Sequence, residues 1–125
     1  MLSLITAAAL AATPAVVGTF GGYEQSIGET RWERFDLVLT NNSAEQQSVS
    51  LCPTDADMVL QTHQKSTRSA FAVKFDDQDW SFNCTSKDLA AGETLTLGMF
   101  FRPAFQPGPS RKIEVKTSVG SYILG

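Results

Sequence analysis

Charged side chains are scarce in this chain, making up only 18% of its 125 residues with a formal net charge of −3. The lysines and arginines are scattered between Arg31 and Lys116, so the sequence has no basic stripe that could neutralise a row of phosphates. We therefore do not expect this protein to bind nucleic acid. Because 42% of the residues are hydrophobic, the chain is too apolar for disorder and poor in charge for a free monomer. We therefore expect a neighbouring molecule to cover part of its surface.

Residues that carry chemistry are also few. His63 is the only histidine, and the sequence has no G-x-S-x-G motif, phosphate-binding glycine loop or nucleotide fingerprint. A solvated loop residue is the favoured interpretation of His63, and a hydrolase that uses it is the weaker alternative. Asp76, Asp77 and Asp79 lack the glycine and distal glutamate of an EF-hand, which favours a hydrated turn over a Ca²⁺ site. We expect no enzymatic activity, no cofactor and no metal.

Only two cysteines occur, Cys52 and Cys84, which is too few for a four-thiolate metal site. Neither belongs to a C-x-x-C pair, and neither lies beside His63 in the sequence. They form either a disulfide or two buried, small apolar residues. The choice depends on the redox compartment, so the sequence leaves both interpretations open.

No apolar run reaches the ~20 residues that a membrane-spanning helix needs. The nearest candidate is the N-terminus, where no charged side chain precedes Glu24. We interpret residues 1–14 as an apolar arm that packs on its own domain or on a neighbour. The alternative is a secretory signal peptide cleaved near Ala15, although the basic region expected at its start is missing. On the arm interpretation, the large apolar side chains are candidate interface residues: Leu2, Leu4, Ile5 and Leu10.

Strand-like segments separated by turn residues fill most of the remaining sequence, and no long stretch keeps a helical period. The predicted strands are residues 15–20, 32–40, 48–52, 71–75, 94–102, 113–118 and 122–124. Residues 54–69 are hardest to assign, and a loop with a helical turn is favoured over an edge strand. About seven short strands at this spacing predict one all-β domain, residues 15–125, with two packed antiparallel sheets.

Two neighbouring phenylalanines end the strand at residues 94–102. Alternation places Leu95, Leu97, Met99 and Phe101 in the core, so Phe100 faces the other way. We expect Phe100 to meet solvent, the N-terminal arm or another subunit, unless the proline-rich residues 103–109 cover it.

Other aromatic residues are candidates for the predicted interface. Trp80 and Phe82 form either a contact patch or another core row, of which the core row is favoured. If a patch forms, Trp32, Trp80 and Phe100 are the expected aromatic part of an interface.

Two segments suggest a family. "FGGYEQSIGETRWERFDLVLTNNS" (residues 20–43) and "LAAGETLTLGMFFRP" (residues 89–103) resemble bacterial immunoglobulin-like domains of the ASH and choice-of-anchor-D kind. The resemblance implies an immunoglobulin-like β-sandwich that binds or scaffolds, with no active-site residues to transfer. Domains of this kind serve in adhesins, periplasmic proteins, cilia-associated proteins and phage virions. Residues 52–69 and the uncharged N-terminus depart from the pattern.

The function expected from these observations is structural. We expect a phage virion decoration, cement or accessory module that binds other protein subunits, in a homo- or hetero-oligomer, through its N-terminal arm and a sheet surface. The alternative is a secreted or periplasmic binding or adhesion module with a cleaved signal peptide and a Cys52–Cys84 disulfide. Neither interpretation includes a membrane span.

Overall fold

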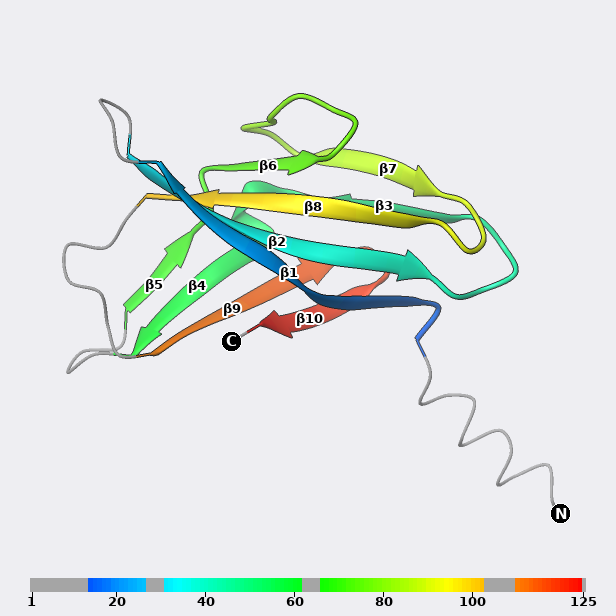
Figure 1. Ribbon diagram of the computed structural model, residues 1–125, viewed down its shortest axis with the longest axis horizontal. Helices are drawn as coiled ribbons and strands as arrows, with labels where there is room; N and C mark the ends of the chain where they lie inside the picture. The colour runs from blue at the N-terminus through cyan, green and yellow to red at the C-terminus, as the bar shows by residue number, and fades with distance from the viewer. Residues whose placement is uncertain (1–13, 27–30, 62–65, 103–109, 125) are drawn as a thin grey trace, which may run out of the picture.

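The computed structural model describes residues 14–26, 31–61, 66–102 and 110–124. These residues form an all-β sandwich, which confirms the predicted fold class. They contain ten strands and one short 3-10 turn, more strands than the sequence predicted. Figure 1 shows the two main sheets stacked one above the other.

Antiparallel pairing connects the strands within every sheet. The first sheet has the order β1 (Val16–Ser26), β2 (Trp32–Asn41), β8 (Thr94–Phe101) and β6 (Ala72–Phe75). The second has the order β10 (Gly120–Leu124), β9 (Ser110–Thr117), β4 (Ala56–Gln61) and β5 (Ser66–Ser69). A two-stranded sheet joins β3 (Gln47–Leu51) to β7 (Thr85–Leu89), and the 3-10 turn η1 (Pro53–Asp55) follows β3.

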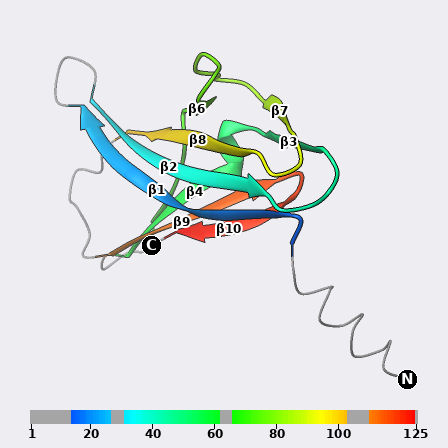
Figure 2. The same ribbon diagram turned by 45° about the vertical axis from the view of Figure 1, so that its right-hand side comes forward.

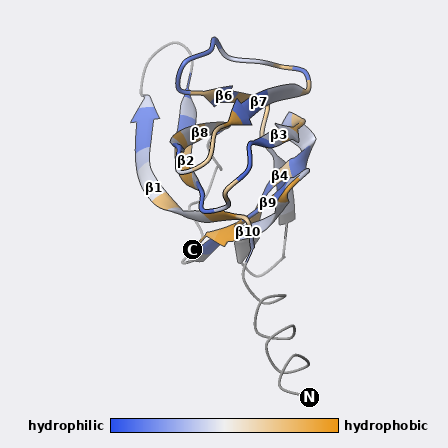
Figure 3. Cartoon of the chain, turned by 90° about the vertical axis from the view of Figure 1, so that its right-hand side faces the viewer, coloured by the Kyte–Doolittle hydropathy of each residue, from blue (hydrophilic) through white to orange (hydrophobic). Residues whose placement is uncertain are grey.

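The core lies between the two main sheets, and alternation along β2 and β8 builds its upper wall. The paired inward residues are Phe35 with Met99, Leu37 with Leu97, and Leu39 with Leu95. The predicted core row of β8, which includes Phe101, is thus confirmed. Each such side chain contributes about 1.5–3 kcal/mol by leaving water. Figure 3 views the layers from the side and shows the second sheet facing this wall.

A buried asparagine fixes the corner where β2 ends. The side-chain amide of Asn41 donates to the carbonyl oxygens of Leu89, at 2.9 Å, and Glu45, at 2.8 Å. Its Oδ1 accepts from the backbone N–H of Ser43 at 3.0 Å. Asn41 therefore satisfies three backbone groups, two in the loop after β2 and one at the end of β7, that would otherwise lack these partners.

β1 is longer than predicted. The predicted strand ended at Phe20, before the two glycines, but β1 continues to Ser26 through a bulge between Phe20 and Gly22. A Cβ on Gly21 would lie 2.7 Å from the side chain of Val38, and Gly22 has φ +152°. The two glycines therefore bend the strand instead of ending it.

The described residues of the segment 54–69, which are 54–61 and 66–69, are mainly strand, so the prediction of a loop is wrong. The predicted helical turn corresponds to the 3-10 turn η1, and after it β4 and β5 pair antiparallel. β4 is an interior strand that pairs with β5 and with β9, and its Ala56 and Met58 alternate into the core. His63 lies outside the described residues.

One carboxylate is buried at the edge of the core. Glu33 is 2% exposed, and its Oε1 accepts from the Arg111 guanidinium and from the Tyr23 hydroxyl, the latter at 2.9 Å. Its Oε2 has no hydrogen-bond partner among the described residues. The Arg111 side chain therefore supplies the opposite charge that makes burial of this carboxylate tolerable.

Both tyrosines of the chain have a raised pKa. Burial is the main cause at Tyr23, where the Glu33 carboxylate adds to it, and burial also raises the pKa of Tyr122. We expect both phenols of the folded protein to ionise above their ordinary pKa of about 10, and near 10 in urea. Because the folded pKa values are raised, their contribution to stability is present below about pH 10 and is lost as the pH rises through them. Ultraviolet absorbance titration measures this, and a folded-state phenol that ionises at or below the urea value would contradict it.

Candidate functional site

Five aromatic residues gather on the outer surface of the first sheet, away from the core. We call them the aromatic face: Trp32, Phe71, Trp80, Phe82 and Phe100. They come from β2, from β8 and from segments on either side of β6. None of the five belongs to the hydrophobic core cluster. The aromatic face is therefore a second cluster on the opposite side of the sheet.

Phe100 lies at the centre of this cluster. Trp80 stacks on it with ring centroids 4.5 Å apart and planes 6° apart, while Trp32 meets it edge-on at 5.4 Å. Phe100 is consequently only 2% exposed, so the expectation that it meets solvent, the arm or another subunit is corrected. Side chains of the chain itself cover it. Residues 103–109, the alternative cover, lie outside the described residues.

The outermost members of the aromatic face are Trp80 and Phe82. They are 43% and 67% exposed, so the favoured interpretation of a core row is wrong, and the contact-patch alternative stays a prediction. The reason is a β-bridge between Val73 and Ser81, with N–H···O distances of 3.0 and 2.8 Å in the two directions. This bridge turns the chain back over the outer side of β6.

Residues 76–84 form a loop, here called the cover loop, that carries both exposed rings. An ion pair between Lys87 and Asp77 fastens it at one point. A hydrogen bond of 3.2 Å from the Thr85 hydroxyl to the Gln78 side chain fastens it at a second. The Lys87 ammonium group lowers the pKa of the Asp77 carboxyl by hydrogen bonding to it. Together with the Val73–Ser81 bridge, these contacts hold the rings in place.

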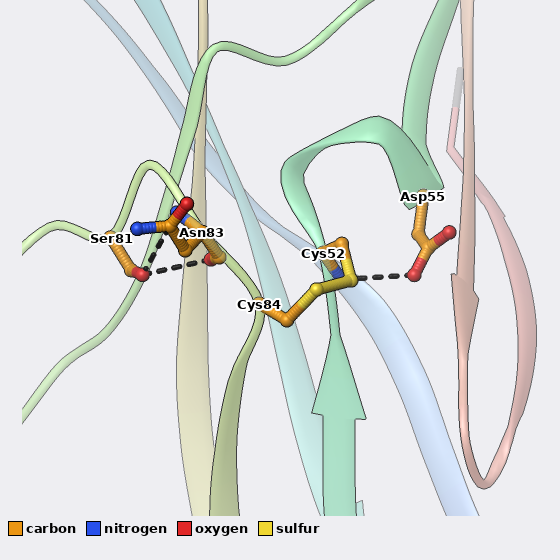
Figure 4. Close-up of a disulfide and its surroundings, with 5 residues drawn as sticks. All are labelled: Cys52, Asp55, Ser81, Asn83 and Cys84. Carbon is orange, nitrogen blue, oxygen red and sulfur yellow. Dashed lines mark hydrogen bonds between the residues drawn. A yellow bond between two sulfur atoms is a disulfide. The ribbon is translucent and has the colours of Figure 1, made fainter.

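A disulfide joins Cys84, at the end of the cover loop, to Cys52 (Figure 4). The backbone N–H of Cys52 donates to the Asp55 carboxylate at 2.9 Å, which fixes the bridge to the 3-10 turn η1. The sequence left a disulfide and two buried thiols open as alternatives. The bond ties the cover loop to a segment 32 residues earlier in the chain.

Two arginines lie against the rings. The Arg34 guanidinium is 5.4 Å from the Phe100 ring centroid and also bonds Asp36 at 2.6 Å. Arg34 has room to lie across β8 because Gly98 has no side chain; a Cβ there would be 2.7 Å from Nε of Arg34. Arg102 lies 5.2 Å above the Phe71 ring. Such cation–π contacts contribute ~0.5–1 kcal/mol each at exposed sites.

The structure describes some of the predicted interface residues and not others. Trp32, Trp80 and Phe100 lie together in the aromatic face. The apolar arm residues lie outside the described part of the chain: Leu2, Leu4, Ile5 and Leu10. The acidic cluster is dispersed, because Asp76 is 3.6 Å from Arg34 while Asp77 pairs with Lys87. In the described ranges, no three His, Cys, Asp or Glu side chains are placed to hold a metal ion.

Sequence reasoning did not find Phe71, Arg34 or Arg102 as members of this site. One signal was available, since the outward row of β8 contains Gly98 next to Phe100, which leaves room for a side chain from the neighbouring strand. The bridge that brings the cover loop over β6 has no comparable local signal.

Comparison with models of known protein families finds no match for this chain, and a search of curated proteins also finds none. Within the described ranges, no helix is long and apolar enough to cross a membrane.

Proposed function

We propose that this protein is a non-enzymatic module that binds protein subunits of a larger assembly through its aromatic face. The observation that carries the proposal is the exposure of Trp80 and Phe82 on a loop that is fastened by a disulfide, a β-bridge and an ion pair. A patch used only for packing would place its large rings inward. Here two large rings face solvent in fixed positions.

Fixed aromatic rings suit a protein interface for an energetic reason. Tryptophan and other aromatic residues are enriched among the side chains that dominate binding energy. Because the fastened loop is already ordered, binding loses less conformational entropy than it would from a free loop. Arg34, Asp36, Asp76 and Arg102 add a polar border around the rings, as protein interfaces usually have.

The assembly that we propose is a virion, in which the module serves as a decoration, cement or accessory subunit. The β-sandwich and the resemblance to immunoglobulin-like domains of the ASH and choice-of-anchor-D kind support this role. In this proposal the apolar arm, residues 1–14, is a second contact with a neighbouring subunit.

One observation favours the second candidate, a secreted or periplasmic binding module. The Cys52–Cys84 disulfide fits an oxidising compartment, such as the periplasm or the extracellular space. Virion surfaces are also oxidising, so the bond alone does not separate the candidates. Intact mass does: a chain that lacks the residues before Val16 indicates export, whereas one that keeps residues 1–14 in purified particles indicates the virion role.

The proposal predicts that Trp80→Ala combined with Phe82→Ala reduces occupancy on purified particles, or on the envelope fraction for an exported protein. We expect a decrease on the order of 30-fold in affinity, because hot-spot residues contribute about 2 kcal/mol or more. Quantitative immunoblotting of washed particles measures the occupancy. The matched control is Ile123→Ala, since Ile123 is a comparably exposed apolar residue, at 61%, on β10 of the other sheet.

The control should bind as the unaltered protein does, and circular dichroism should show both variants folded. Equal occupancy of the Trp80/Phe82 variant and the unaltered protein would remove the aromatic face from the interface.

A further inference from the structure

The edge strands β1 and β10 lie side by side where the two main sheets meet. We call this line of contact the seam, and the two strands diverge along it. At one end the Tyr122 hydroxyl donates to the Val16 carbonyl at 2.8 Å. Gly18 leaves room for the Tyr122 ring there, since a Cβ would be 2.6 Å from it. Beyond this point β1 bends at its bulge and moves away from β10, as Figures 2 and 3 show.

A pocket of about 330 Å³ lies where the seam opens. The lining residues are apolar apart from Arg111. The others are Phe20, Phe35, Ile113 and Leu124. Phe20 is 57% exposed at its rim. An open apolar pocket at the edge of a core can receive apolar side chains from another segment.

Strand pairing shows what kind of segment fits this pocket. Among the described residues, the pairing of β10 with β9 reaches Leu124 opposite Ile113. The next residues of β9, Ser110–Lys112, pair with β4 on one side and with no described strand on the other. An extended segment can therefore add beside this part of β9, where no described strand lies, through main-chain hydrogen bonds.

The same register directs a side chain into the pocket. On β10 the inward side chains are those of Tyr122 and Leu124, so the next inward position on this line lies opposite Arg111. Arg111 lines the pocket. A strand added here thus places every second side chain against Phe20 and Phe35.

Charge restricts the occupant to a neutral segment. Arg111 is already paired with Glu33, whose Oε2 is buried with no partner in the described part of the chain. The rest of the lining is apolar, so a charged side chain entering the pocket would lose its hydration without gaining an unpaired partner of opposite charge. Residues 1–13 of this chain are uncharged and include Leu2, Leu4 and Ile5.

We propose that the seam pocket of one copy binds the segment Leu2–Ile5 of a second copy by strand addition, an inference that rests on the proposed role of the arm in assembly. Residues 1–13 can extend by at most about 45 Å. They precede Val16, at the closed end of the seam, whereas the pocket lies toward the open end. This reach is enough for the arm of one copy to enter the pocket of another, so two copies related by a twofold axis can exchange arms, fill both pockets and close the assembly. An arm that enters the pocket of its own copy would instead give a monomer.

Sedimentation velocity over a dilution series tests the exchange. The full chain is expected to be a dimer, and a chain that lacks residues 1–13 is expected to be a monomer. Phe20→Asp, which charges the pocket rim, and Leu4→Asp, which charges the arm, should also be monomers. Ile123→Asp is the matched control and should stay dimeric, because Ile123 is as exposed as Phe20 but does not line the pocket.

Mixing gives the decisive result. The truncated chain has a pocket but no arm, and the Phe20→Asp variant has an arm but a blocked pocket, so together they should form a heterodimer. A monomeric full chain, a truncated chain that still dimerises, or a mixture without heterodimer would each overturn the exchange. These outcomes are independent of the Trp80/Phe82 occupancy test, so failure of one proposal does not imply failure of the other.

Discussion

Replacing Arg111 with methionine is expected to lower the free energy of unfolding by about 3–5 kcal/mol at neutral pH. The variant leaves the Glu33 carboxylate buried, at 2% exposure, without its cationic partner. The Tyr23 hydroxyl remains as a donor but carries no charge to offset that of the carboxylate. Methionine keeps much of the apolar length of arginine, so the loss arises mainly from charge.

Urea unfolding measures this effect, and a second substitution identifies its cause. Adding Glu33→Gln to Arg111→Met removes the uncompensated charge and should restore most of the lost stability, because a neutral side chain costs less to bury. Lys112→Met is the matched control on the neighbouring, exposed position of β9 and should change stability by less than ~0.5 kcal/mol. A loss below about 1 kcal/mol in Arg111→Met would mean that the ion pair does not support the fold.

Removing the disulfide should have the other large effect. Replacing Cys52 and Cys84 with serine releases a closure of 32 residues, for which the loss of chain-entropy stabilisation is about 4 kcal/mol. The cover loop also loses its tether to η1, so Trp80 should stack less firmly on Phe100. The expected result is a lower unfolding midpoint and a red-shifted tryptophan emission before unfolding begins.

Denaturation of the oxidised protein and the serine variant, followed by tryptophan fluorescence, tests both parts. The probe is specific because the only two tryptophans, Trp32 and Trp80, belong to the aromatic face. Reduced but unaltered protein serves as a control for the substitutions and should behave like the variant. An unchanged midpoint together with an unchanged emission would show that the disulfide holds neither the fold nor the cover loop.

Predictions from the sequence were good where the relevant forces are local. Alternating apolar residues on β2 and β8 identify the wall of the core, because one face of each strand is buried against the second sheet. The inward position of Phe101 and the outward position of Phe100 follow from the same alternation. The burial of Phe100 does not, because it depends on Trp80, which a long-range bridge brings over the sheet.

The strands that the sequence missed have a related explanation. β7 is polar apart from Leu89, and only its pairing with β3 makes it a strand. The residue pattern of β4 also fits a turn of helix. Its pairing with β5 decides in favour of the strand. Thus the architecture could be predicted, and Trp32, Trp80 and Phe100 could be named as one set. How the aromatic face is packed could not be predicted, since its members come from four separate segments.

Iodide quenching of tryptophan fluorescence tests the role of the aromatic face most directly. In the free protein, iodide should quench Trp80, which is 43% exposed, more than Trp32, which is less exposed. In particles that carry the protein, or on its envelope partner, quenching of Trp80 should fall to the level of a buried residue, because a subunit covers the ring. Equal quenching of Trp80 in the free and the assembled protein would contradict the proposed binding surface.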